Sequence, residues 1–205
     1  MTDVDWPECR NARDLGGLPT MDGSVTGKGV LYRTESLCLL TEAGVAAVRK
    51  AGIARIIDLR WQRELDAEPG PFAGDPIYRH VPMLEDVLSY EVRHETYGPM
   101  LDFNRERIAA AFVALATAPP DGGVIVHCQG GRDRTGVLVA LALAVAGVPA
   151  EEIAADYGLS PERPPIAMAN TLDHLESRYG GAAGYLREIG VTAAEIEAVR
   201  ARLRS

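Results

Sequence analysis

The sequence predicts an α/β domain with a helical C-terminal layer, and three observations support this fold class. Short apolar runs rich in β-branched residues, at 53–59 and 124–126, alternate with helical patterns over the first two thirds of the chain. Residues 137–146 are nearly all apolar, which is typical of a helix buried on most faces. From residue 150 onward the pattern is only helical, so a layer of helices is expected after the sheet.

The first half of the chain supplies strands separated by turns and a helix. Residues 42–51 have a helical pattern that Gly52 ends, and the apolar run 53–59 follows directly as a buried strand. Residues 69–76 are rich in proline and glycine and predict a loop. A further strand is expected within residues 77–83.

The second half begins with a long amphipathic helix. Ile108, Phe112 and Leu115 recur at helical spacing, which predicts a helix over residues 103–118. The apolar run 124–126 then predicts a short strand that leads directly into a polar loop.

The C-terminal layer is expected to contain at least three helices. Two of them cover residues 150–157 and 166–179. Thr192 and Glu195 have the spacing of a capping box, which predicts the start of a last helix that ends near Leu203.

Length and composition indicate an acidic globular protein. The 205 residues are expected to form one domain, residues 1–205, and the formal net charge is −8. An acidic chain argues against nucleic acid as the main partner, although a local basic pocket can still bind a small anion.

Three cysteines and an N-terminus without a signal-like or membrane-spanning pattern predict a cytoplasmic protein. Export without a signal and the oligomeric state are left open.

The loop after residues 124–126 has the composition of an anion-binding site. Gln129, Gly130 and Gly131 allow the backbone to curl so that its N–H groups can surround an anion. The positive end of the following helix, expected to start near Thr135, points to the same place. Arg134 adds a planar fork that matches phosphate oxygens.

Cys128 stands at the entrance of this loop. The field that holds an anion also favours the thiolate form of a cysteine, which is the nucleophilic form. Five residues separate Cys128 from Arg134, so the loop can close around one phosphate. Thr135 is expected to donate a hydrogen bond to the sulfur. The chance that these residue types fall in register by composition alone is small, so we favour a nucleophile over a buried structural thiol.

The stretch from His127 to Gly136, with Cys128-x5-Arg134-Thr135 at its centre, resembles the signature loop of the protein tyrosine phosphatase superfamily. Within that superfamily it is most similar to the bacterial tyrosine/serine protein phosphatase family. Segments 11–17, 32–34, 57–60 and 156–160 also resemble that family, in the same order along the chain.

The resemblance implies a protein-tyrosine-phosphatase-like fold, with a central, mostly parallel sheet flanked by helices, and a single phosphatase domain. It also implies a cysteine-dependent phosphomonoesterase that forms a phospho-cysteine and needs neither metal nor cofactor. Asp133 would be the general acid, where the simpler alternative is a helix cap that orients Arg134. Arg132 occupies a position where the family commonly has lysine, so any substrate preference set by that position is open.

Several residues are expected to support the loop. His127 is expected to brace it and to tune the cysteine. Asp58 and Arg60 end a strand, at the edge where open α/β sheets place their sites, although a surface salt bridge is the alternative. Asn11, Arg13 and Asp14 are expected to stabilise an N-terminal turn beside the site rather than to take part in the chemistry.

Phosphotyrosine on a protein is the expected substrate, with phosphoserine or phosphothreonine as further possibilities. The main alternative is a phosphoinositide phosphatase, because Arg132 and Arg134 at one pocket would suit a multiply phosphorylated head group. Sulfur transfer is less favoured because the loop ends in Arg134-Thr135, which argues for phosphate. A phosphate-binding module without turnover is less favoured because Cys128, Asp133 and Arg134 are all present. Residues 84–104 form either a lid or an ordinary surface connection.

Overall fold

Within residues 2–204, which the computed structural model describes, the sheet has six strands in the order β1-β2-β3-β6-β4-β5. The strands are β1 (Thr2–Asp3), β2 (Arg13–Asp14), β3 (Leu31–Thr34), β4 (Ile53–Asp58), β5 (Tyr78–His80) and β6 (Gly123–His127). The four strands β3, β6, β4 and β5 are parallel, whereas β1 and β2 add an antiparallel edge. The expected α/β fold with a mostly parallel sheet is therefore confirmed.

The helices of the described chain follow the predicted alternation and then the predicted helical layer. They are the 3-10 turn η1 (Leu37–Leu39) and the α-helices α1 (Glu42–Lys50), α2 (Gln62–Ala67), α3 (Gly98–Phe103), α4 (Arg105–Ala116), α5 (Asp133–Val145), α6 (Ala150–Gly158), α7 (Pro165–Tyr179), α8 (Ala182–Glu188) and α9 (Ala193–Leu203). The Thr192–Glu195 capping box at the start of α9 is present as predicted.

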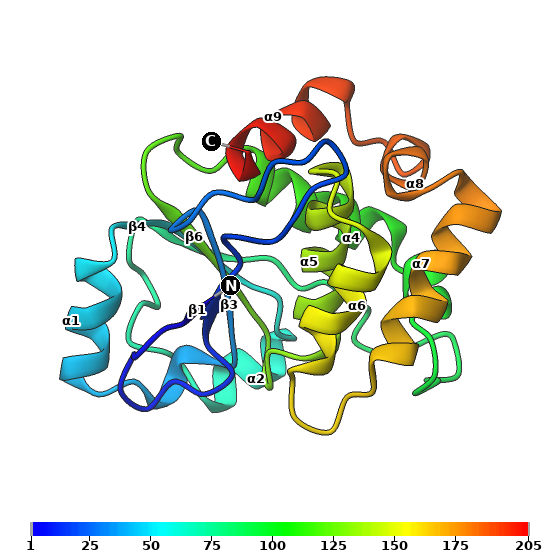
Figure 1. Cartoon of the computed structure of the whole chain (residues 1–205). Coiled ribbons are helices and arrows are strands. Elements are labelled where there is room, and N and C mark those ends of the chain that lie inside the picture. Colours follow the sequence, from blue (N-terminus) through cyan, green and yellow to red (C-terminus); the bar gives the residue numbers. More distant parts are fainter. Residues whose placement is uncertain (1, 205) are drawn as a thin grey trace.

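The two faces of the sheet are covered by different helices, because successive side chains of a strand point to opposite faces. Ile56 of β4 and Ile125 of β6 pack in one apolar cluster with Val48 of α1. Ile57 and Val126, the next residues along each strand, belong to the larger cluster, which includes α4 and α5. Figure 1 shows α1 on one side of the sheet and α4 to α9 gathered on the other.

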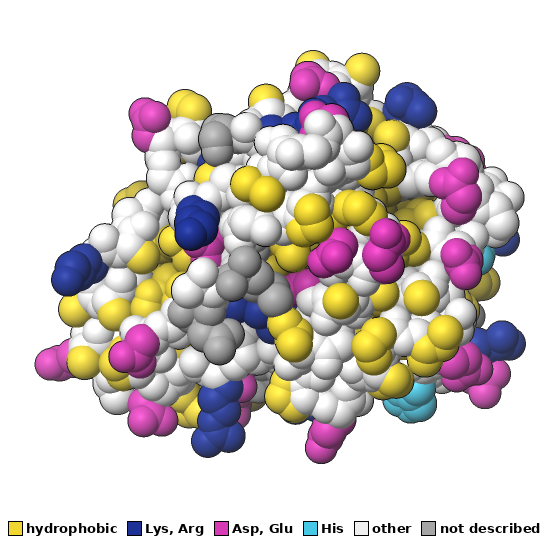
Figure 2. All heavy atoms as spheres, viewed as in Figure 1, with side chains coloured by type: hydrophobic (Ala, Val, Ile, Leu, Met, Phe, Trp, Pro, Cys, Tyr) yellow, Lys and Arg dark blue, Asp and Glu magenta, His cyan; other side chains and the backbone are white. Residues whose placement is uncertain are grey.

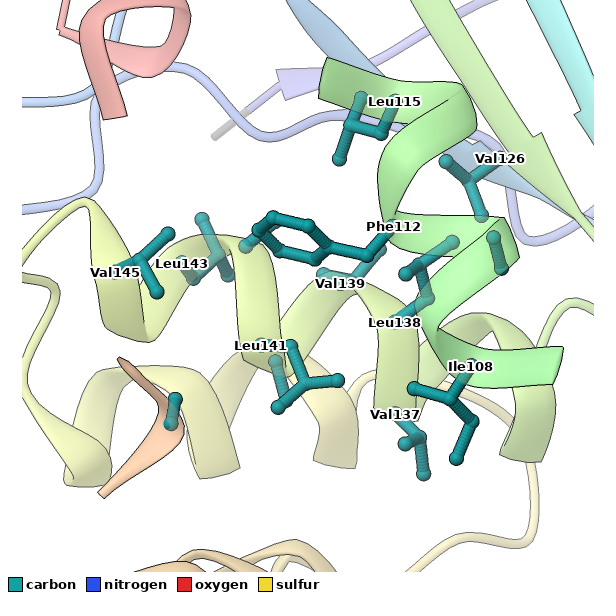
Figure 3. Packing of buried hydrophobic residues seen from close by; sticks show 14 of the residues in the cluster. Ile108, Phe112, Leu115, Val126, Val137, Leu138, Val139, Leu141, Leu143 and Val145 are labelled. Atoms are coloured by element: carbon teal, nitrogen blue, oxygen red, sulfur yellow. The ribbon is translucent and has the colours of Figure 1, made fainter. Parts of the chain in front are cut away.

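Helix α5 is the centre of the larger cluster, and almost all of its residues are buried. Figure 3 shows Ile108 and Phe112 of α4 facing Val137 and Val139 of α5. Burying each large apolar side chain contributes roughly 1.5–3 kcal/mol, so α5 and its N-terminal end are firmly anchored. Across residues 2–204, α5 and the other helices are all too short or too polar to cross a bilayer.

The segment before α4 differs from the prediction. The helix expected over residues 103–118 is α4, which begins two residues later and ends two residues earlier than predicted. A further short helix that was not predicted, α3, precedes it, with a break at Asn104 between the two. The Asn104 amide oxygen accepts a hydrogen bond from the Glu85 backbone N–H at 2.9 Å, and its Nδ2 donates to the Met100 carbonyl at 3.0 Å. Such side-chain bonds compete with the helical backbone, which explains the break.

The carboxyl ends of β4 and β6 lie side by side, and Asp58 pairs with His127 in the parallel register. In Figure 1 these ends meet near α2, where the chain passes from β6 into α5. Open α/β sheets place their sites at such an edge. Figure 2 shows acidic and basic side chains interspersed over the face that it presents.

Candidate active site

The loop from Cys128 to Arg132 joins β6 to α5 and turns sharply at Gly131. Gly131 has φ +64°, and a Cβ atom there would lie 2.1 Å from the Thr34 carbonyl oxygen. A larger residue would therefore clash with β3, and glycine is required for both reasons. Helix α5 begins at Asp133, two residues earlier than the sequence predicted, so Asp133 and Arg134 lie in its first turn.

Donors from distant segments hold three successive carbonyls of this loop. Asn11 Nδ2 donates to Gly130 at 3.2 Å and to Gly131 at 3.0 Å. The Ser36 backbone N–H donates to the Gln129 carbonyl at 2.9 Å, and Arg33 donates to Gly131 at 2.9 Å. These bonds fix the curvature of the loop before any ligand binds.

A buried ion cluster stands behind the loop. The Asp156 carboxylate of α6 accepts Arg13 Nε at 2.8 Å and Arg33 at 2.7 Å, and all three side chains are buried. Arg33 reaches from this cluster to the Gly131 carbonyl, so the cluster connects α6, β2 and β3 to the loop. The predicted support by Arg13 is thus seen together with two partners that were not predicted.

Cys128 is a buried free thiol that lines a pocket of about 220 Å³. The pocket is lined by Cys128, Gln129, Gly130, Arg132, Asp133, Arg134 and Arg163. Six of these seven residues come from the signature loop, whereas Arg163 comes from the connection between α6 and α7.

Arg134 is held in a fixed orientation by α2. Its two terminal nitrogens donate to the two Glu64 carboxylate oxygens at 2.6 and 2.9 Å. The guanidinium carbon lies 4.5 Å from the centre of the Trp61 ring, a cation–π distance. Burial opposes the charged form, but the hydrogen bonds to Glu64 and the charge of Cys128 raise the pKa of Arg134. Arg134 is therefore a permanent cation beside the thiol.

Asp58 and Arg60 form a buried pair at the end of β4, so the alternative of a surface salt bridge is wrong. Asp58 accepts three hydrogen bonds from the Arg60 side chain and one from the Tyr78 hydroxyl at 2.6 Å. Although burial opposes it, the nearby His127 ring and these bonds lower the pKa of Asp58 to about 2. His127 Nε2 lies 3.8 Å from the same carboxylate, and burial lowers the pKa of His127. The group braces β6 immediately before the cysteine.

Asp133 is surrounded by donors from three other elements. Arg163 Nε and Nη2 donate to the two carboxylate oxygens at 2.6 and 3.1 Å. The Tyr97 hydroxyl also donates to Asp133, and Tyr97 and Tyr157 share a hydrogen bond of 2.6 Å. Burial opposes ionisation, but the bonds from Arg163 and Tyr97 and the charges of Arg163 and Arg134 lower the pKa of Asp133.

A second, mostly apolar pocket of about 200 Å³ adjoins the first, and the two share Asp133 and Arg134. Its walls include Trp61, Leu84, Leu88, Tyr90, Val92, Tyr97 and Met100, with Arg93 and His94 among the remaining lining residues. The segment expected to be either a lid or a connection thus supplies most of this wall. Whether it moves stays a prediction.

The tyrosine phosphatase family model matches this chain over residues 4–167 and 163–205, which is nearly the whole sequence. The chain belongs to the tyrosine phosphatase family. A tyrosine-protein phosphatase of Nostoc commune is 30% identical over 215 residues, covering 83% of this chain and 73% of that protein. The triple specificity protein phosphatase PtpB of Mycobacterium tuberculosis is 26% identical, covering 85% and 75% of the two chains. The crystal structure of TpbA from P. aeruginosa matches 85% of this chain and 86% of its own, at 15% identity and a TM-score of 0.42.

The predicted site residues of this phosphatase lie together, but one predicted contact is not seen. Cys128, Gln129, Gly130, Arg132, Asp133 and Arg134 line one pocket, and the Asp58–Arg60 pair lies against His127 immediately before them. The Thr135 hydroxyl is buried and has no partner among the described residues, so the expected bond to sulfur is absent. The outer loop residues bond to acidic side chains instead, Gln129 to Glu68 at 2.7 Å and Arg132 to Glu162 at 2.9 Å.

Sequence reasoning missed four side chains that complete the site. They are Glu64, Tyr97, Tyr157 and Arg163. Tyr157 lies within segment 156–160, which resembles the phosphatase family, and Tyr97 lies within the predicted lid or connection, residues 84–104. Glu64 and Arg163 carried no signal in the sequence.

Replacing Glu64 by glutamine is expected to lower kcat/KM of this phosphatase about 10- to 100-fold, since the amide cannot accept both N–H groups of Arg134. The measurement is phosphate release from a phosphotyrosine peptide. Asp66→Asn, on the exposed side of the same helix, is the matched control and should leave the rate unchanged. If Glu64→Gln and Asp66→Asn had the same kcat/KM, the function of Arg134 would not depend on its ion pair with Glu64.

Proposed function

We propose that the protein hydrolyses phosphotyrosine in proteins through a phospho-cysteine intermediate. The observation that carries this proposal is that Cys128 lines the same pocket as Arg134, which lies in the first turn of α5. A thiolate nucleophile, a permanent cation and a helix N-terminus then act on one phosphate.

In the first step, Cys128 Sγ attacks phosphorus and an S–P bond forms. The P–O bond to the leaving oxygen breaks, and Asp133 gives its proton to that oxygen. Negative charge is spread over the three equatorial phosphate oxygens during phosphoryl transfer. Arg134 and the loop N–H groups stabilise this charge. The tyrosine hydroxyl leaves as a neutral phenol.

In the second step, water attacks the phospho-cysteine. Asp133, now a carboxylate, takes a proton from the water, the S–P bond breaks, and the sulfur leaves as thiolate. Inorganic phosphate is released and both groups return to their starting protonation states. A reducing compartment such as the cytoplasm suits this chemistry, because reactive thiolates oxidise readily.

The apolar pocket favours an aromatic leaving group. It opens beside Asp133 and Arg134, and it offers Trp61, Tyr90 and Tyr97 as ring-stacking partners. A phosphoserine side chain would leave this pocket unfilled. Arg93 and His94 on the same wall favour the second candidate, a phosphoinositide with several anionic groups.

The test compares phosphate release from a phosphotyrosine peptide, a phosphoserine peptide of the same sequence and a phosphoinositide in mixed micelles. We expect kcat/KM for phosphotyrosine to exceed that for phosphoserine at least about tenfold, because the ring fills the apolar pocket. A higher kcat/KM for the phosphoinositide would replace the proposed substrate with the lipid. Turnover of none of the three would contradict the phosphatase assignment.

A further inference from the structure

The three arginines of the Cys128 pocket all form ion pairs with carboxylates, but the pairs differ in character. They are Arg132–Glu162 at 2.9 Å, Arg134–Glu64 at 2.6 Å and Arg163–Asp133 at 2.6 Å. The first is exposed and the second orients the arginine of the signature loop. In the third, the arginine is paired with the residue proposed as the general acid.

Arg163 contacts Asp133 and lines the pocket in which a phosphate would bind. It lies between α6 and α7, outside any helix or strand, and its side chain lines the same pocket as Cys128. Two of its nitrogens, Nε and Nη2, donate side by side to the two Asp133 carboxylate oxygens. Two oxygens of a phosphate present the same geometry to a guanidinium fork, so rotation of the side chain alone could exchange one partner for the other.

The pairing conflicts with the chemistry proposed for Asp133. A general acid must carry a proton, whereas Arg163 stabilises the carboxylate form, and the pKa of Asp133 is lowered. The other groups that face Asp133 are Tyr97, Tyr157 and Arg134. Burial raises the pKa of Tyr97 and that of Tyr157, the latter to about 12, so both phenols remain hydrogen-bond donors at neutral pH. Of the two arginines, Arg134 is fixed by Glu64, which leaves Arg163 as the partner that can move.

We propose that Arg163 is a substrate-binding residue that alternates between Asp133 and the phosphate of the substrate. This inference rests on the proposed function. When the phosphate dianion enters, the Arg163 fork transfers to two phosphate oxygens. Asp133, still held by Tyr97 and Tyr157, takes up a proton from solvent and then donates it to the leaving oxygen. Substrate binding thereby brings Asp133 into the protonated form that a general acid needs.

The test uses Arg163→Met and Arg163→Lys, with kcat/KM measured from pH 4 to 9 on a phosphotyrosine peptide. Loss of the arginine raises the pKa of Asp133, so the acid stays protonated to higher pH. In Arg163→Met the falling limb of the profile should therefore move to higher pH by about one unit or more. The inhibition constant of inorganic phosphate should also rise on the order of tenfold, since a charged hydrogen-bond donor is lost.

Arg163→Lys keeps the charge but lacks the planar fork. The falling limb of its pH profile should therefore stay close to the wild-type pH, while phosphate should still bind more weakly than to the wild type. Arg178→Met, an exposed arginine of α7 paired with Asp102, is the control and should change neither quantity. The inference would be overturned if, in Arg163→Met, the falling limb of kcat/KM stayed at the wild-type pH and the inhibition constant of inorganic phosphate was unchanged.

Asp133→Asn separates this inference from the proposed function. If Asp133→Asn keeps the wild-type kcat and the falling limb, Asp133 is not the acid and the proposed mechanism fails. If Asp133→Asn removes the limb while Arg163→Met does not move it, the acid is correctly assigned and only the role of Arg163 is wrong.

Discussion

Phosphate release should fall by at least about 10⁴-fold when Cys128 is replaced by serine, because a serine hydroxyl is not ionised near neutral pH and cannot replace the thiolate as nucleophile. Serine is close in size to cysteine and the site is polar, so thermal unfolding should change little. The measurement is single-turnover and steady-state phosphate release from a phosphotyrosine peptide. The variant should still bind the peptide, since Arg134 and the loop remain.

Cys9→Ser is the matched control for this experiment. Burial raises the pKa of Cys9 to about 12, so that thiol stays protonated at neutral pH and cannot serve as the nucleophile. Its replacement should leave the rate within about twofold of the wild type. A Cys128→Ser rate within tenfold of the wild type would rule out the phospho-cysteine mechanism.

The largest expected effect on stability follows from Asp156→Asn. The change leaves Arg13 and Arg33 buried without their shared counter-charge, which typically costs about 3–5 kcal/mol. For a chain of this size, the midpoint of thermal unfolding should fall by roughly 10 °C or more. Differential scanning calorimetry or urea unfolding measures the effect directly.

Asp173→Asn tests whether any loss of a carboxylate has the same effect. Asp173 is exposed on α7, so its replacement should change the free energy of unfolding by less than about 0.5 kcal/mol. If Asp156→Asn cost less than about 1 kcal/mol, the neutral acceptors of the two arginines would be sufficient, and the charge of Asp156 would not be a source of stability.

The main elements of the fold could be predicted because their signals are local. The strand before Cys128 and the helix after it are continuous apolar runs, and α9 has its capping box in four consecutive residues. The short helices α2, α3 and α8, of 6, 6 and 7 residues, were not predicted. Helices this short show too little periodicity to be recognised, and tertiary packing stabilises them.

The sequence by itself determined the chemistry of the loop, since Cys128, Gly131 and Arg134 act through one strand–turn–helix unit that is contiguous in the chain. Only the tertiary structure decided which side chains complete the site. Glu64 reaches Arg134 across 70 residues, and Arg163 reaches Asp133 across 30. No local pattern distinguishes these charged residues from others on a solvated surface. They become partners because the sheet places β4 beside β6, and because α6 and α7 pack against α5.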